Sequence, residues 1–217
     1  MQKTFAKAPL WEVTQVLTAT ALGKRPADLV IRNVRVIHVC TAEISEPTDI
    51  AVAAGRIAMI GKADHCIGEN TLVIDGRGQY AAPGFLDGHI HIESSMLSAG
   101  EYGRAVIAHG TTGIYADPHE ICNVLGMDGV RALIDDAARV PLKVMITMPS
   151  CVPAVPGFED TGAAIGAEDI AESMTWPTVI GLGEMMNYPG IWSGAETPHR
   201  EIAETLKADG TVTGHYP

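Results

Sequence analysis

From residue 83 onward, short apolar segments alternate with segments of helical periodicity, and this alternation restricts the fold more than any other feature of the chain. The apolar segments predict strands, and the spacing of apolar side chains between them predicts helices. The predicted strands are 85–91, 112–116, 142–147, 179–182 and 211–214, and the predicted helices are 101–109, 128–140, 167–174 and 198–208. Repeated strand–helix units form a parallel sheet, so the sequence predicts an α/β fold.

Polar side chains follow four of these strands. They are His89 and His91 after the first, Asp117, His119 and Glu120 after the second, Glu184 after the fourth, and His215 after the fifth. A barrel gathers the carboxyl ends of all its strands in one place, where its active site lies, whereas an open sheet spreads them along a line. We therefore predict that residues 83–217 are the first part of a TIM-type (β/α)8 barrel.

The predicted barrel segment is incomplete. Only the first five of eight strands are present, and the segment is much shorter than the roughly 250 residues of a typical barrel. A parallel sheet of this size leaves two unpaired apolar edges, which promote aggregation. We expect that the native polypeptide is longer or that a second chain supplies the remaining strands.

Two further segments precede the barrel. Residues 1–25 are predicted to be a helical segment with a helix at 10–22, because Leu10, Val13 and Leu17 repeat at helical spacing. Residues 26–82 are predicted to be a small β-domain built from hairpins. Its predicted strands are 28–39, 50–52, 56–60 and 72–74, with a tight turn at Ala54–Gly55.

Composition excludes several classes of function. The formal net charge of −11 disfavours binding to nucleic acid, because an acidic chain repels phosphates. No apolar run approaches the ~20 residues that span a membrane. The four cysteines lie far apart without a CxxC pair, which indicates reduced thiols in a cytoplasmic protein. Self-association into a homo-oligomer is compatible with these features.

The pair His89 and His91 has the spacing of a metal site. On a strand, residues i and i+2 point to one face, so both imidazoles can reach the same ion. Neutral histidine nitrogens bind metals at about 2.0–2.1 Å. A bare His-x-His pair also occurs at ordinary polar strand ends, so the wider context decides between the two interpretations.

That context resembles the amidohydrolase superfamily, and the adenine deaminases within it in particular. The run Pro83–His91 is similar to the first barrel strand of the superfamily. Three separated motifs resemble adenine deaminases in their order: His-Ile-His-Ile-Glu-Ser-Ser-Met at 89–96, Ala-Asp-Pro-His-Glu-Ile at 116–121, and Gly-Leu-Gly-Glu-Met-Met-Asn-Tyr-Pro-Gly at 181–190. The resemblance extends from about Pro26 to the end of the chain.

The resemblance implies a fold, a reaction and a cofactor. The fold is a metal-dependent-hydrolase barrel preceded by a small β-sandwich domain. The reaction is hydrolytic deamination of adenine to hypoxanthine and ammonia, a step of purine salvage, through attack of a metal-activated hydroxide on C6. The cofactor is a divalent metal, two ions in number, with Mn or Fe(II) favoured over Zn.

The resemblance also implies roles for individual residues. His89, His91, Glu184 and His215 are the expected metal ligands, with Glu184 between the two ions, where many relatives have a modified lysine. His215 is followed here by Tyr216 rather than by the alanine that is usual in the family.

Other polar residues near the strand ends have several interpretations. His119 and Glu120 could supply a ligand, orient one or carry a proton, and we expect a catalytic role. Asp117 either caps the following segment or supports the site. Glu93 and Ser94 begin the loop after the first strand, where they could cap a helix, contact substrate or support a ligand.

Two other functions fit part of the pattern. A cyclic-amide hydrolase related to dihydroorotases or hydantoinases shares the His-x-His strand, but a lysine in place of Glu184 would favour it. A non-catalytic fragment fits the missing half of the barrel, whose eighth strand carries the carboxylate that usually acts as the base in this superfamily.

Overall fold

The computed structural model describes residues 8–215, which divide between Pro83 and Gly84 into two compact units. The first seven residues of the predicted helical segment 1–25 lie outside the described residues, as do the last two of the predicted barrel segment. None of the helices in the described range combines the length and hydrophobicity that a membrane-crossing helix needs.

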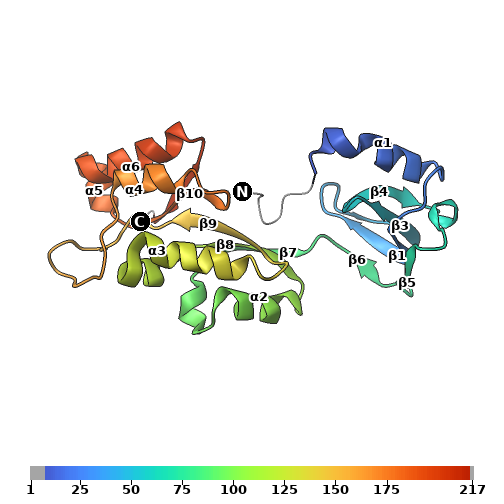
Figure 1. The fold of residues 1–217 in the computed structure, drawn as a ribbon, viewed down its shortest axis with the longest axis horizontal. Coiled ribbons are helices and arrows are strands. Elements are labelled where there is room, and N and C mark those ends of the chain that lie inside the picture. Colours follow the sequence, from blue (N-terminus) through green and yellow to red (C-terminus); the bar gives the residue numbers. More distant parts are fainter. Residues whose placement is uncertain (1–7, 216–217) are drawn as a thin grey trace. The chain divides into compact units, whose positions relative to one another are not determined.

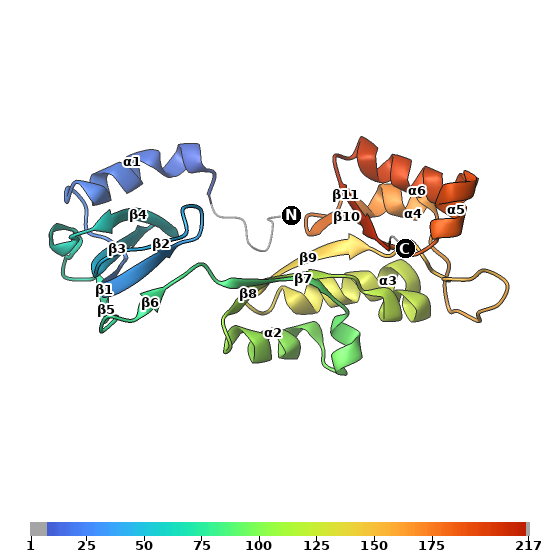
Figure 2. The same ribbon diagram turned by 180° about the vertical axis from the view of Figure 1, so that it is seen from behind.

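The unit of residues 8–83 is built on one six-stranded sheet (Figures 1 and 2). Its strands are β1 (Leu29–His38), β2 (Glu43–Ile44), β3 (Thr48–Ala53), β4 (Arg56–Gly61), β5 (Leu72–Asp75) and β6 (Tyr80–Ala81). The predicted tight turn joins β3 to β4, where Ala54 and Gly55 both have positive φ, as a two-residue hairpin requires.

The pairing of β1 corrects the expectation of a domain made of hairpins. β1 pairs antiparallel with β2 and β3, but parallel with β5 and β6. The sequence pattern missed β2 and β6 because each has only two residues, too few to show alternation.

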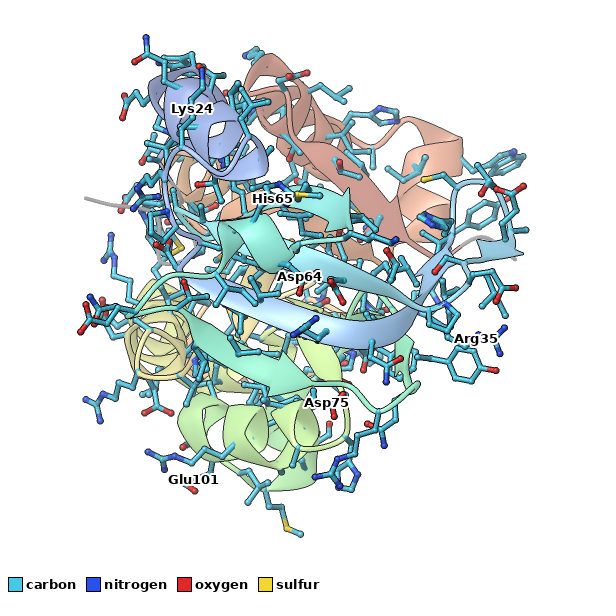
Figure 3. The ribbon with its side chains drawn as sticks, turned by 90° about the vertical axis from the view of Figure 1, so that its right-hand side faces the viewer. Lys24, Arg35, Asp64, His65, Asp75 and Glu101 are labelled. Atoms are coloured by element: carbon cyan, nitrogen blue, oxygen red, sulfur yellow. The ribbon has the colours of Figure 1, made fainter. Side chains whose placement is uncertain are left out.

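Helix α1 (Leu10–Ala21) packs against β3 and β4 of this sheet. It ends before Gly23, whose positive φ suits glycine. The 3-10 turn η1 (Asp64–Cys66) holds the end of the helix, because the His65 Nε2 donates a hydrogen bond to the Ala21 carbonyl at 2.9 Å. Figure 3 shows His65 beneath the helix. The helix is thus part of this unit, not a separate segment.

The unit from residue 84 onward contains a five-stranded, all-parallel sheet. Its strands follow one another in chain order as β7 (Phe85–Ile90), β8 (Thr111–Ala116), β9 (Lys143–Met148), β10 (Val179–Met185) and β11 (Thr211–Gly214). A strand is present at each of the five predicted positions, and the α/β class is confirmed. Ile114, Ile146 and Leu182 are fully buried in its core.

Helices cover this sheet. They are η2 (Ile92–Ser95), α2 (Ala99–Ile107), α3 (His119–Ala137), α4 (Ala167–Ser173), α5 (Tyr188–Ser193) and α6 (Glu196–Lys207). The sheet curls, so that α2 and α3 lie near its first strands, whereas α4 and α6 pack together near its last (Figures 1 and 2).

Two helices differ from the sequence prediction. α3 begins at His119, nine residues before the predicted start at 128, because Gly126 has a positive φ that kinks the helix and interrupts its apolar periodicity. His119 and Glu120 therefore lie in its first turn rather than at a strand end. α5 was not predicted, since it is a single short segment capped by the Asn187 side chain.

Substitution of Gly181 tests whether β10 and β11 pack as closely as the structure shows. A Cβ atom at this position would lie 1.9 Å from the backbone oxygen of Thr211, which cannot move without separating the two strands. We expect Gly181→Ala to lower the free energy of unfolding by about 1–3 kcal/mol in a urea titration, as overpacking usually does. Gly88→Ala, in β7 of the same sheet, is the control, because its Cβ would meet nothing within 4 Å. Equal stability of the two variants would contradict this packing.

Glu201 on α6 should make stability depend on pH. The side chain is 2% exposed, and burial raises its pKa from 4.5 to about 7. The folded state therefore holds this proton more tightly than the unfolded state does. Its stability is highest below the unfolded pKa and falls as the pH rises towards 7.

Replacing Glu201 with Gln removes this titration. We expect the stability advantage of Glu201→Gln over wild type to be about 2–3 kcal/mol larger at pH 8 than at pH 5, from ~1.4 kcal/mol per pKa unit. Urea unfolding at the two pH values measures it. An advantage that does not change with pH would show that Glu201 titrates normally.

Candidate metal centre

His89 and His91 lie at the end of β7 and face the same carboxylate. Their Nε2 atoms are 3.2 Å apart, as expected for residues i and i+2 of a strand. Each Nε2 is 3.5 Å from a Glu184 oxygen, His89 from Oε2 and His91 from Oε1. Glu184 comes from β10, so two strands that are distant in the sequence supply this group.

The second ring nitrogen of His91 fixes its orientation. Its Nδ1 lies 2.9 Å from the backbone oxygen of Asp117, and because a carbonyl only accepts, Nδ1 must carry the hydrogen. Nε2 is then left with its lone pair toward Glu184. This arrangement is common for histidines that bind metals, where a carbonyl or carboxylate holds the nitrogen that does not bind.

Asp117 and His119 form a second group with Glu184. The Asp117 side chain is fully buried, and its Oδ2 accepts a hydrogen bond from the Glu184 backbone N–H at 2.5 Å. Burial raises the pKa of Asp117. Asp117 does not cap α3, because its carboxylate points to Glu184 and the cap position is Pro118.

His119 is held in the same manner as His91. Its Nε2 donates to the Cys151 carbonyl at 2.8 Å, so Nδ1 is the free nitrogen. This Nδ1 faces Asp117 Oδ1 at 3.8 Å, too far for a hydrogen bond. The Asp117 carboxylate raises the pKa of His119. Neither facing atom has a hydrogen-bond partner within residues 8–215, although both are buried.

Glu184 therefore belongs to two sets of candidate ligands. In each set, His89–His91–Glu184 and Asp117–His119–Glu184, one ligand atom per residue lies within 4.8 Å of the others. His215 joins through its Nε2, which is 2.8 Å from Glu184 Oε2, and its backbone N–H bonds to Met185. All the residues expected to bind metal are thus close together.

Glu120, Ser94 and Glu93 surround the His91 side of the site. Ser94 donates to Glu120 Oε1 at 2.6 Å, and Glu120 Oε2 is 3.5 Å from His91 Nδ1. Glu93 accepts from the Ile121 N–H at 3.1 Å, in the first turn of α3, and burial raises the pKa of Glu93. Glu93 therefore acts on the start of α3, whereas the serine that caps a helix here is Ser98, on α2.

The sequence analysis missed the turn Ser150–Cys151, which follows β9. Ser150 Oγ donates to the Glu184 carbonyl at 3.0 Å, and the Cys151 carbonyl holds His119. The Cys151 sulfur accepts from the Met186 N–H at 3.2 Å. Its position after the third predicted strand could have pointed to this turn, because polar clusters also follow the neighbouring strands.

An open hollow of about 560 Å³ adjoins Glu184 and His89. Tyr115, Thr147 and Thr213, from the neighbouring strands, also line it. A small molecule of drug size occupies a pocket of roughly 300–1,000 Å³, so this hollow has room for one next to the candidate ligands.

Asp117 should matter for both folding and metal binding. Asp117→Ala leaves the buried Glu184 N–H without its acceptor, which costs about 1–3 kcal/mol of folding free energy. We also expect Mn²⁺ affinity to fall at least tenfold, as for groups that orient ligands, where ~10–100-fold is typical. Urea unfolding and Mn²⁺ titration measure the two effects.

Asp128→Ala on α3 is the matched control, because the side chain of Asp128 is 89% exposed and pairs with Arg131 on the same helix. Neither quantity should change measurably in it. Wild-type stability and affinity in Asp117→Ala would contradict the role of the Asp117–Glu184 contact.

The sequence of this chain is similar to a known protein family. The model of the amidohydrolase family matches residues 80–213. The adenine deaminase of Clostridium botulinum is 62% identical over 216 residues, covering 100% of this chain and 36% of that protein. The adenine deaminase of Moorella thermoacetica is 53% identical over 210 residues, covering 97% and 35% respectively. The chain spans about a third of the length of these curated relatives.

Solved structures show the same fold at low sequence identity. Atrazine chlorohydrolase TrzN from Arthrobacter aurescens TC1, complexed with zinc, superposes with a TM-score of 0.65 at 17% identity, covering 87% of this chain and 53% of that one. An N-acyl-D-glutamate deacylase from Bordetella bronchiseptica, also with zinc, gives 0.56 at 16% identity, covering 88% and 45%. Because the family model matches more than half of the chain, the chain belongs to the amidohydrolase family.

Proposed function

We propose that this chain is the N-terminal part of an adenine deaminase, and that it supplies most of a metal centre for hydrolysis of adenine to hypoxanthine and ammonia. The convergence of two donor sets on Glu184 supports metal-dependent hydrolysis. Adenine as the substrate comes from the relatives, which are 62% and 53% identical to this chain. Because the chain spans only 36% of the first of them, the activity belongs to the complete protein.

The donor atoms fit divalent cations. Two buried atoms, Asp117 Oδ1 and His119 Nδ1, lack hydrogen-bond partners in the described residues and face one another beside Glu184. Histidine and carboxylate donors suit Mn, Fe(II) or Zn. We propose two ions with Glu184 between them, since a shared carboxylate offsets the repulsion between two cations. His89 and His91 would hold one ion, and His119 or His215 would complete the set.

Bound divalent cations would make water acidic enough to supply hydroxide near neutral pH, by lowering its pKa towards about 7. The residues of this chain orient and move protons around that reaction. The carbonyls of Asp117 and Cys151 hold the rings of His91 and His119, each with its free nitrogen toward the ligand cluster.

Glu120 is our candidate for carrying a proton to the leaving nitrogen. Its side chain is 47% exposed at the mouth of the site, and Ser94 fixes one of its oxygens. A carboxylate in such a position can exchange protons with both water and substrate. His119 would offer its Nδ1 to a cation, because its Nε2 is held by the Cys151 carbonyl.

The proposal also covers the whole protein. The five-stranded sheet would be part of an eight-stranded barrel, and residues 83–217 would be the first part of that barrel domain. The sheet of residues 29–81 would be one layer of a β-sandwich, and residues 26–82 would be that domain. All four cysteines are free thiols in the structure, which supports a reducing, cytoplasmic location.

Adenine turnover tests the proposal. The complete open reading frame containing this chain would be expressed, stripped of iron by chelation and loaded with Mn²⁺. We expect release of hypoxanthine and ammonia from adenine, and none of the corresponding products from dihydroorotate or hydantoin. Cyclic-amide hydrolysis without adenine turnover would establish the rival enzyme, and inactivity of the loaded, complete protein toward all three substrates would exclude both.

Glu184→Gln should abolish this activity, because the amide cannot replace the charge that both donor sets share. We expect a loss of more than ~100-fold in kcat/KM, beyond the range for groups that only orient a ligand. Glu168→Gln is the matched control, since that side chain is 77% exposed on α4 and pairs with Arg200. Activity of Glu184→Gln within tenfold of wild type would remove Glu184 from the centre.

A further inference from the structure

Glu201 is a buried acid whose side chain has no polar protein partner in the part of the chain that the structure describes. It lies in the middle of α6, is 2% exposed, and makes no side-chain hydrogen bond or ion pair within residues 8–215. The other deeply buried carboxylate, Asp117, accepts a hydrogen bond from Glu184. Because an unpaired buried carboxylate is costly, a residue such as Glu201 needs either a proton or water.

A small cavity supplies room for water beside it. The cavity has a volume of about 40 Å³ and is lined by Glu201, Ser150, Cys151, Asn187 and Thr197, together with Met185 and several prolines. One water needs roughly 10–15 Å³ of such volume and two or more polar partners. A water molecule in this cavity would have polar groups of Glu201, Ser150 and Asn187 among its lining.

Ser150 and Cys151, which line the same cavity, form the turn that holds two candidate ligands. Ser150 donates to the Glu184 carbonyl at 3.0 Å, and the Cys151 carbonyl accepts from His119 at 2.8 Å. A change in the hydrogen bonding of Ser150 or Cys151 can therefore affect Glu184 and His119 directly, because each of these two residues is hydrogen-bonded to the turn.

We propose that Glu201 is a positioning residue for the metal centre, which acts through water and the Ser150–Cys151 turn on the peptide of Glu184. The inference rests on the metal centre proposed above. Among the described residues, the Glu201 side chain makes no hydrogen bond or ion pair with a candidate ligand, so its effect is on how firmly the turn holds them.

The state of Glu201 decides the direction of the effect. A neutral carboxyl group donates one hydrogen bond, whereas an ionised one only accepts. Ionised Glu201 competes for the single hydroxyl hydrogen of Ser150, which otherwise bonds to the Glu184 carbonyl. Burial raises the pKa of Glu201 to about 7, so both states are populated near neutral pH.

Burial is the cause of the raised pKa of Glu201, and no charged neighbour in the described residues contributes to it. Cys151 is the only other titratable residue that lines the cavity. The charged side chains nearby on α6 and α4 are engaged elsewhere: Arg200 with Glu168, Lys207 with Glu204, Glu172 with Arg131, and Asp169 with the Gly166 N–H. His199 bonds to the Ile191 carbonyl.

Mn²⁺ affinity at two pH values tests the proposal in the complete protein. Glu201→Gln keeps the shape of the side chain but is neutral throughout. At pH 6 we expect wild type and Glu201→Gln to bind Mn²⁺ equally. At pH 8 the wild type should bind about tenfold more weakly than the variant, the lower end of the effect of groups that orient ligands. Because each comparison is made at one pH, the titration of the ligands themselves cancels.

Two further variants separate positioning from a general loss of structure. Glu204→Gln, on the same helix, removes an acid that is 30% exposed and paired with Lys207, and should match wild type at both pH values. In a Ser150→Ala background, Glu201→Gln should have no effect, because the link is gone; such coupling is what a double-mutant cycle detects.

The outcomes are distinct. A ratio of affinities that is the same at pH 6 and pH 8, or a full effect of Glu201→Gln without the Ser150 hydroxyl, would overturn the role of Glu201 while leaving the metal centre intact. Absence of Mn²⁺ binding in every protein at both pH values would overturn the metal centre and this inference with it.

Discussion

The hydrogen bond from the Glu184 backbone N–H to the buried Asp117 carboxylate connects the two halves of the candidate site. It joins the end of β8 to β10 across the intervening strand β9, at 2.5 Å. Asp117 also offers its carbonyl to His91, so one residue fixes a ring from the first strand and a peptide of the fourth. The geometry around Glu184 depends on this residue because the side chains concerned come from elements far apart in the sequence.

The parallel sheet makes this convergence possible. Strands of one direction end at the same edge, so residues at or just after the ends of β7, β8, β9 and β10 meet there. Histidine rings are then oriented by backbone carbonyls, of Asp117 for His91 and of Cys151 for His119. The chain thus holds the rings of His91 and His119 by main-chain contacts, which do not change with pH, whereas the group that we propose to modulate the cluster, Glu201, is titratable.

The sequence predicted the parts of this arrangement that have a periodic or residue-type signature. The strands β7 to β11 were found from apolar segments, whereas the assignment of His89, His91 and Glu184 as ligands came from the resemblance of their motifs to adenine deaminases. Contacts made by backbone atoms have no such signature, which is why the Ser150–Cys151 turn was missed. The start of α3 was misplaced because Gly126 breaks its periodicity, and the parallel pairing of β5 and β6 with β1 cannot be read from strands this short. Burial of Glu201 could not be foreseen either, because a lone glutamate in an amphipathic helix normally faces solvent.

The most direct measurement of the central claim is the position of metal in crystals of the complete protein grown with Mn²⁺, located by anomalous scattering at the Mn edge. The account predicts two peaks on either side of Glu184, each about 2.0–2.2 Å from one of its oxygens, by analogy with carboxylate–metal distances. His89 and His91 should ligate one of them. Peaks elsewhere in the protein, or peaks near His89 and His91 that Glu184 does not touch, would contradict it.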